Sequence, residues 1–206
     1  MLQYITNTSV ATPVAEQIKG VIHGGCRWVQ IRMKDASDEE IRAVFSEIRP
    51  LADETQTVII INDRVELARE LGKDGVAGVH IGKHDMLPIK AREFLGPMAI
   101  KGVTANTFDD ILAVRSLDVD YIGIGPYADT TTKADLAPVL GLEGFASLCR
   151  EMDSHEIQFP RVAVGGITLS DIKPLTEAGA NGIAVSGDIA RSEDIAEATR
   201  RYIDIL

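Results

Sequence analysis

Short apolar runs rich in β-branched residues alternate along this chain with longer segments whose apolar residues recur at helical spacing. The apolar runs predict eight strands, at Leu2–Ile5, Trp28–Arg32, Val58–Ile61, Gly78–Ile81, Ala99–Val103, Tyr121–Ile124, Arg161–Val164 and Gly182–Val185. A strand plus a helical segment therefore repeats roughly every 25 residues, which is the pattern of a parallel sheet with helical crossovers.

Helix-start signals fall between these runs. Ser37 and Glu40 have the spacing of a capping box, and Thr107, Ser170 and Ser192 are expected as N-cap residues of later helices. Eight strand–helix units predict one closed (β/α)8 TIM barrel over residues 1–206, in the α/β class. A doubly wound open sheet is the alternative. Its first turn usually carries a glycine fingerprint, whereas the first turn here reads TNTSVATP.

Charge and composition restrict the kinds of partner. A net charge of −10 argues against nucleic acid, because binding to a phosphate backbone needs a basic face. No apolar run approaches the roughly 18 residues of a membrane span, and the first basic residue is Lys19, so no secretory signal is expected. Cys26 and Cys149 match no metal-binding spacing, which favours reduced thiols and a cytoplasmic location.

The second predicted strand continues into the polar sequence QIRMK. Because residues two apart in a strand point the same way, Gln30, Arg32 and Lys34 share one face, and Val29 and Ile31 share the other. Barrel strands are normally apolar on both faces, so two cations at this strand's end predict an anionic ligand. An edge strand with one solvated side is the alternative.

Acidic residues follow the third and fourth strands. Asn62 and Asp63 come directly after an apolar run, and Asp85 would lie beside Asp63 because neighbouring strands are about 4.8 Å apart. Two such carboxylates suit Mg²⁺, although Asp63 could instead cap the next helix. His80 and His84 raise zinc as another alternative. Since no cysteine or third histidine has ligand spacing, His80 is expected in the core or beside the ligands.

Glycine-bearing turns follow the last two strands, in AVGGI and AVSGDI. Loops at these two positions of a barrel commonly bind phosphate through backbone N–H groups, so the two turns together predict a phosphate site. Turn formation alone is the alternative reading of these glycines.

The loop from Gly125 to Gly141 is unusually long for a compact domain and begins GPYADTTTK. Loops of this length are often functional lids, and the loops after barrel strands lie on the catalytic face. Thr130, Thr131, Thr132 and Lys133 are therefore expected to supply hydroxyls and one ammonium to bound anions.

Seven motifs in order resemble the thiamine-phosphate synthase (thiamine-phosphate pyrophosphorylase) family: QIRMK, IINDR, GVHIGKHD, GVTANT, YIGIGPYADTTTK, AVGGI and GIAVSGDI. The resemblance runs from about Tyr4 to the last helix. It implies a Mg²⁺-dependent transferase that joins 4-amino-2-methyl-5-(diphosphooxymethyl)pyrimidine to 4-methyl-5-(2-phosphooxyethyl)thiazole, giving thiamine phosphate and diphosphate.

The resemblance also implies a role for each candidate residue. The pyrimidine diphosphate would be held by Gln30, Arg32, Lys34, Asn62, Thr104 and Lys133. The Mg²⁺ would be carried by Asp63 and Asp85. The thiazole phosphate would be bound by Thr130 and Thr132, with Thr131 between them, and by Gly166, Ser186 and Gly187. Arg32, Lys34 and Lys133 would be catalytic, because they would stabilise the departing diphosphate.

The sequence departs from the family pattern at a few positions. Met33 stands where Glu is frequent, Lys83 and His84 replace Gln-Glu, Asn106 replaces His, and Asp188 places an acid beside the expected phosphate pocket. A thiazole tautomerase-like isomerase and a non-catalytic thiamine-phosphate-binding barrel are the alternative functions. The oligomeric state is open, with a homodimer among the alternatives.

Overall fold

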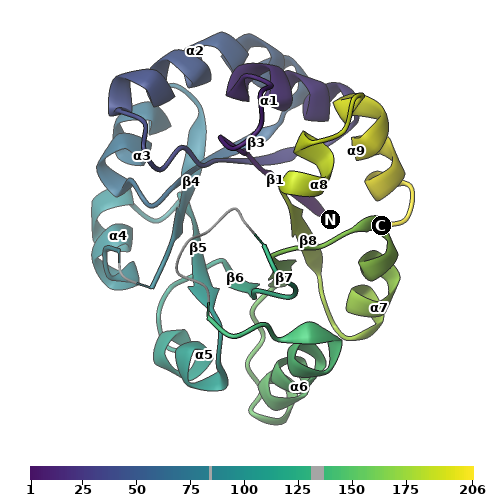
Figure 1. Cartoon of the computed structure of the whole chain (residues 1–206). Coiled ribbons are helices and arrows are strands. Elements are labelled where there is room, and N and C mark those ends of the chain that lie inside the picture. The colour runs from purple at the N-terminus through teal and green to yellow at the C-terminus, as the bar shows by residue number, and fades with distance from the viewer. Residues whose placement is uncertain (84, 131–136) are drawn as a thin grey trace.

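The chain forms a closed barrel of eight parallel strands that pair in sequence order, with β8 returning to β1 (Figure 1). The computed structural model describes residues 1–83, 85–130 and 137–206. The strands are β1 (Leu2–Ile5), β2 (Trp28–Ile31), β3 (Val58–Asn62), β4 (Val76–Ile81), β5 (Ile100–Ala105), β6 (Tyr121–Ile124), β7 (Arg161–Val164) and β8 (Gly182–Val185). The predicted (β/α)8 fold is therefore confirmed, and the open-sheet alternative is wrong.

Helices surround the barrel on its outside (Figure 1). They are α1 (Val14–His23), α2 (Asp38–Thr55), α3 (Val65–Gly72), α4 (Pro88–Leu95), α5 (Phe108–Val114), α6 (Gly141–Ser154), the 3₁₀ turn η1 (Leu169–Asp171), α7 (Ile172–Glu177), α8 (Gly187–Ala190) and α9 (Ile195–Ile203). Within the described ranges, no helix combines the length and the apolar character that crossing a membrane requires.

Two predicted helix starts are confirmed and two are wrong. Ser37 caps α2 and Thr107 caps α5, each through a complete capping box. Ser170 and Ser192 do not act as N-caps. The 3₁₀ turn ahead of α7 is capped by Thr168, and α9 is capped by Asp194, whose carboxylate accepts from the Glu197 N–H.

The two faces of each strand pack into different cores, as the period-two pattern predicts. Val29 and Ile31 belong to the large core between barrel and helices, where both cysteines are also buried as free thiols. A smaller core fills the barrel interior and includes Ile60 and Tyr121. Polar side chains share this interior, among them the buried Gln3 and Gln30.

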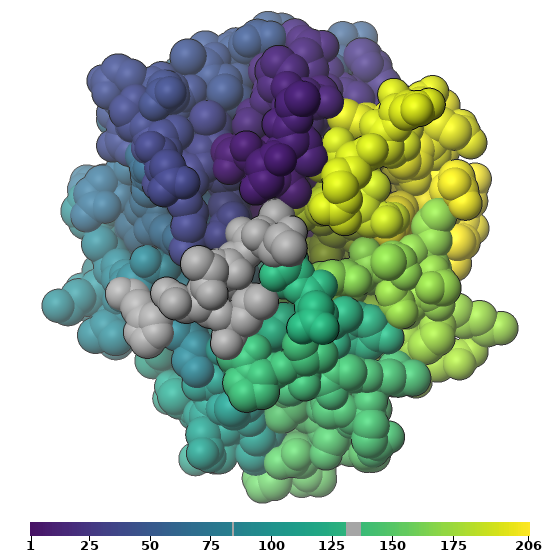
Figure 2. Space-filling view, in the orientation of Figure 1, coloured from purple at the N-terminus to yellow at the C-terminus, as the bar shows by residue number. Residues whose placement is uncertain are grey.

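The beginning and the end of the chain complete the ring together. Leu2 of β1 pairs with Ile183 of β8, and α1 packs against α9. In the space-filling view the purple N-terminal and yellow C-terminal segments lie side by side (Figure 2).

Candidate active site

A polar hollow lies where β2 and β3 end. Its volume is about 310 Å³, and its lining residues are Met33, Lys34, Asp35, Asn62, Asp63 and Arg64. The structure thus brings together three residues that the sequence singled out, namely Lys34, Asn62 and Asp63. This hollow is at the C-terminal end of the strands, the end at which barrel enzymes carry their active sites.

The cations of QIRMK lie at the end of β2. Gln30 is 2% exposed inside the barrel, and Arg32 and Lys34 follow the last strand residue. The main chain of Arg32 is fixed to β1, because its N–H donates to Thr6 Oγ1 (2.8 Å) and the Thr6 hydroxyl donates to the Arg32 carbonyl (3.0 Å). Burial lowers the pKa of Arg32, while the nearby Asp63 and Asp35 carboxylates favour its charged form.

Asp63 and Asp85 face each other, as expected for neighbouring strands. A Cβ placed on Gly82 would lie 2.6 Å from Asp85 Oδ2 and 3.6 Å from Asp63 Oδ1, so both carboxylates border one small space. Asp85 is fixed there because its Oδ2 accepts from the Gly82 N–H at 2.9 Å. Burial and the contact with Asp85 raise the pKa of Asp63 to about 6, against the opposing effect of Lys34 and Arg32.

The backbone of Asp63 explains why this residue is not a helix cap. Its φ of 63° lies in the left-handed region, and its N–H donates to the His80 carbonyl at 2.8 Å, which joins β3 to β4. Helix α3 takes Arg64 as its N-cap residue instead. The capping alternative for Asp63 is therefore wrong, and its carboxylate faces Asp85.

The donor set at this point suits a hard cation. Two carboxylates with a position open to substrate oxygens and water are what Mg²⁺ commonly takes in proteins. The described residues contain no group of three or more His, Cys, Asp or Glu that could hold a metal alone. His80 lies inside the barrel, with Nδ1 2.8 Å from Tyr121 Oη and Nε2 3.0 Å from Thr104 Oγ1.

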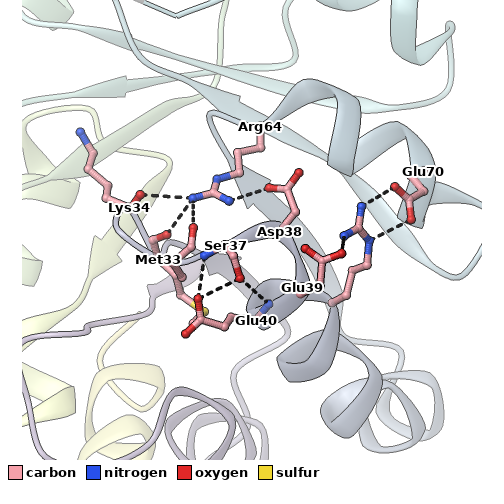
Figure 3. A network of polar contacts seen from close by, with 10 residues as sticks. Met33, Lys34, Ser37, Asp38, Glu39, Glu40, Arg64 and Glu70 are labelled. Atoms are coloured by element: carbon pink, nitrogen blue, oxygen red, sulfur yellow. Dashed lines mark hydrogen bonds and ion pairs between the residues drawn. The ribbon is translucent and has the colours of Figure 1, made fainter.

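Arg64 is a site residue that sequence reasoning missed. Its guanidinium holds the loop after β2 by donating to the carbonyls of Met33 (3.4 Å), Lys34 (3.2 Å) and Ala36, and it pairs with Asp38 at 2.5 Å (Figure 3). It therefore holds the main chain at Lys34 in place. The available signal was an arginine directly after Asn-Asp in IINDR.

The glycines after β7 have a local explanation. Gly165 and Gly166 have φ values of 101° and 65°, and a Cβ on Gly166 would lie 2.5 Å from the Asp129 carbonyl oxygen. They are thus required by the turn and by the close approach of the loop after β6. A phosphate role for Gly166 remains a prediction.

The end of β8 offers a clearer ligand signal. Among the described residues, Ser186 Oγ is buried without a hydrogen-bond partner. The guanidinium of Arg191 lies over Gly187, where a Cβ would be 2.4 Å from one of its terminal nitrogens. Arg191 is a second cation that the sequence reasoning missed. Asp188 turns to Tyr202, whose hydroxyl donates to Asp188 Oδ2 at 2.6 Å.

The other departures from the family pattern also have defined contacts. Lys83 pairs with Asp110 at 2.8 Å, so its charge is partly compensated at the start of α5. Asn106 donates to the Gly125 carbonyl and so connects the loops after β5 and β6. Met33 packs partly against the outer core.

Several candidate residues cannot be placed in this geometry. Thr131, Thr132, Lys133 and His84 lie outside the described residues. Thr130 is half-buried at the last described position before that gap.

The C-terminal ends of the strands form the mouth of the barrel. The fold and the residues at this mouth place the chain in the class of (β/α)8 barrels that carry cations and paired carboxylates there. A sequence model of the family described as thiamine monophosphate synthase matches residues 2–189. The chain belongs to the thiamine monophosphate synthase family.

Individual relatives agree with this assignment. The thiamine-phosphate synthase of Bacteroides fragilis strain YCH46 is 45% identical over 204 residues, covering 99% of this chain and 98% of that protein. The thiamine-phosphate synthase of Bacteroides thetaiotaomicron is also 45% identical over 204 residues, covering 99% and 96%. Among solved structures, a thiamine phosphate pyrophosphorylase from Pyrococcus furiosus superposes with a TM-score of 0.84 at 28% identity, covering 99% of this chain and 94% of that one.

Proposed function

We propose that this protein forms thiamine phosphate from 4-amino-2-methyl-5-(diphosphooxymethyl)pyrimidine and 4-methyl-5-(2-phosphooxyethyl)thiazole, releasing diphosphate. The observation that carries the proposal is the Asp63–Asp85 pair beside Arg32 and Lys34, at the mouth of a barrel of this family. Both substrates are phosphorylated, which explains why an acidic chain concentrates cations at one mouth.

The reaction needs charge stabilisation rather than a nucleophilic side chain. The bond between the pyrimidine CH₂ and the diphosphate oxygen breaks, and its electron pair leaves with the diphosphate. The aminopyrimidine ring spreads the resulting positive charge. The thiazole nitrogen then donates its lone pair to the CH₂ carbon and becomes the thiazolium nitrogen, so no proton has to be removed.

The residues of the mouth match these demands. Arg32 and Lys34 would bind the diphosphate and stabilise its growing negative charge, and Lys133 would add a third cation. Gln30, Asn62 and Thr104 would orient the pyrimidine so that its CH₂ faces the thiazole nitrogen. Asp63 and Asp85 would hold Mg²⁺, which when bound would neutralise charge on the leaving diphosphate.

The thiazole phosphate is assigned to the ends of β7 and β8. The Ser186 hydroxyl, which has no hydrogen-bond partner among the described residues, supplies a donor, and the Arg191 guanidinium over Gly187 supplies a cation. The Asp188 carboxylate is held by the Tyr202 hydroxyl and so would not face the phosphate. Thr130, Thr131, Thr132 and Gly166 complete this part of the proposal.

The test is to incubate the purified protein with each substrate alone and with both, with and without Mg²⁺. Diphosphate release that requires both substrates and the metal supports the proposal. Conversion of the thiazole alone would instead indicate a tautomerase, and ligand retention without turnover would indicate a binding protein. Asp63→Ala or Lys133→Ala is expected to lower turnover about a hundredfold or more. Near-normal kinetics in a folded variant would remove that residue from the proposed mechanism.

A further inference from the structure

A chain of polar side chains crosses the barrel interior beneath the mouth. Tyr121 Oη lies 3.2 Å from Gln3 Nε2 and 2.8 Å from His80 Nδ1, and His80 Nε2 lies 3.0 Å from Thr104 Oγ1. A fourth and longer link of 3.5 Å joins Gln30 Nε2 to Gln3 Oε1. The chain thus connects residues of five strands and ends at Thr104, a candidate ligand of the pyrimidine diphosphate.

The barrel interior leaves room for this series of hydrogen-bonded side chains. A Cβ on Gly102 would lie 2.1 Å from Tyr121 Cζ, so only glycine leaves room for the tyrosine ring. A Cβ on Gly123 would lie 3.1 Å from His80 Cε1, which is tighter than an ordinary contact. Trp28 packs edge-on to Tyr121, with ring centroids 4.8 Å apart. Tyr121 is 3% exposed and has little freedom to reorient.

The donors and acceptors give the chain a direction. Gln3 Nε2 can only donate, so Tyr121 Oη accepts from it. Burial raises the pKa of Tyr121, so the phenol keeps its proton. That proton needs an acceptor in this buried position, and His80 Nδ1 lies within reach.

The tautomer of His80 decides which group donates in its hydrogen bond to Thr104. When Nδ1 accepts from Tyr121, the imidazole proton resides on Nε2, which then donates to Thr104 Oγ1. Among the described residues, the Thr104 side chain has His80 as its one hydrogen-bond partner. With Oγ1 accepting from His80, the hydroxyl proton of Thr104 points elsewhere and is available to donate to a ligand.

We propose that Tyr121 and Gln3 are positioning residues, which hold His80 in its Nε2–H tautomer and so present Thr104 as a hydrogen-bond donor to an acceptor atom of the pyrimidine diphosphate. This rests on the proposed function for the identity of the ligand. Which side chains donate and which accept along this series of hydrogen bonds does not depend on the ligand.

Nuclear magnetic resonance tests the tautomer without any substrate. In protein labelled with ¹⁵N-histidine, long-range proton–nitrogen spectra show which ring nitrogen carries the proton, and His80→Gln identifies the signal. The Nε2–H form is expected in the wild type, and a mixture of tautomers is expected in Tyr121→Phe. An Nδ1–H tautomer or a mixture in the wild type would overturn the proposal, whether or not the protein forms thiamine phosphate.

Steady-state kinetics test the link to Thr104. Tyr121→Phe and Thr104→Val are each expected to raise the KM for the pyrimidine diphosphate about three- to tenfold, with a smaller change in kcat. Because Tyr121 acts through Thr104, adding Tyr121→Phe to Thr104→Val should raise the KM no further. Thr104→Ser keeps the hydroxyl and should restore a KM near that of the wild type.

Tyr4→Phe is the matched control. Tyr4 is also fully buried, and its hydroxyl donates to Gln17 at 2.7 Å, away from His80. The control should lose stability without changing the His80 tautomer or the KM. Independent, multiplying effects of Tyr121→Phe and Thr104→Val would overturn the proposal. A wild-type protein that makes no thiamine phosphate would refute the proposed function, while the tautomer would still be decided by the spectra.

Discussion

The guanidinium of Arg64 donates to the main-chain carbonyl of Lys34 at 3.2 Å, so a residue that follows β3 fixes the loop that follows β2. The same side chain also holds the Met33 and Ala36 carbonyls and the Asp38 carboxylate. The main chain at Lys34, a residue that lines the hollow, is therefore held by Arg64, which follows a different strand. A planar group with several donors is required, because these acceptors are spread around it.

Replacing Arg64 is expected to loosen this loop. Arg64→Ala should raise the KM for the pyrimidine diphosphate about tenfold, because Lys34 and Asp35 would lose their fixed main chain. Arg64→Lys should rescue little, since one ammonium cannot reach all four acceptors. Arg42→Ala is the matched control, because Arg42 bridges Glu39 and Glu70 on the surface beside the same network (Figure 3). Equal KM values in both variants would contradict this role.

The raised pKa of Asp63 predicts a pH-dependent stability in metal-free protein. A carboxyl whose pKa rises on folding contributes stability that is present below its unfolded pKa, near 3.8, and lost as pH rises through about 6. The shift corresponds to about 3 kcal/mol, which solvent screening at a half-buried position reduces to about 1–2 kcal/mol. In chemical unfolding, the free energy of unfolding of the wild type, measured relative to Asp63→Asn, should fall by about 1–2 kcal/mol between about pH 4 and pH 7.

Adding Mg²⁺ at neutral pH completes that measurement. A cation between Asp63 and Asp85 relieves the repulsion that raises the pKa, so the metal should stabilise the wild type. It should have little effect on Asp63→Asn. A wild type whose stability relative to Asp63→Asn does not change with pH would contradict the electrostatic account of this pair.

Gly102 is predicted to be indispensable because it makes room for Tyr121. In Gly102→Ala the new Cβ would overlap the tyrosine ring, at 2.1 Å from Cζ, and should cost about 3 kcal/mol or more of unfolding free energy. Gly72→Ala is the control, because a Cβ at that end of α3 meets no described atom within 4 Å. The control should gain about 0.5–1 kcal/mol. Comparable stabilities in thermal unfolding would refute this explanation of Gly102.

Arg191 is predicted to act on one substrate only. Arg191→Ala should raise the KM for the thiazole phosphate about tenfold, since a charge-assisted contact to phosphate would be lost. The KM for the pyrimidine diphosphate should stay unchanged, because Arg191 caps the C-terminal end of α8 and lies over Gly187, outside the hollow lined by Lys34 and Asp63. Arg200→Ala, which removes a surface pair with Glu197, is the control. A thiazole phosphate KM unaffected by Arg191→Ala would exclude the contact.

The fold and part of the site could be predicted because both follow local periodicity. Alternation placed Gln30 inside the barrel and Val29 outside it, and the adjacency of consecutive strands brought Asp63 to Asp85. Both arguments use residues that are near in sequence or on neighbouring strands, where geometry leaves few alternatives.

The missed features depend on contacts that no local pattern encodes. His80 and Tyr121 are 41 positions apart, and Gln3 and Tyr121 are 118 apart, so their chain emerges only when the barrel closes. The wrong N-caps have a different cause. Near Ser170, Thr168 forms the capping box with Asp171, and several such acceptors within a few residues look alike in sequence.

The hydrogen bond from Tyr202 to Asp188 means that α9 controls a charge near the site in addition to packing against the barrel. A chain that ended before Tyr202 would release a carboxylate next to Ser186 and Gly187, where the phosphate of the thiazole is proposed to bind. Trimming or fraying of the C-terminus would thus leave an unpaired negative charge beside the proposed thiazole-phosphate site and weaken the binding of that substrate.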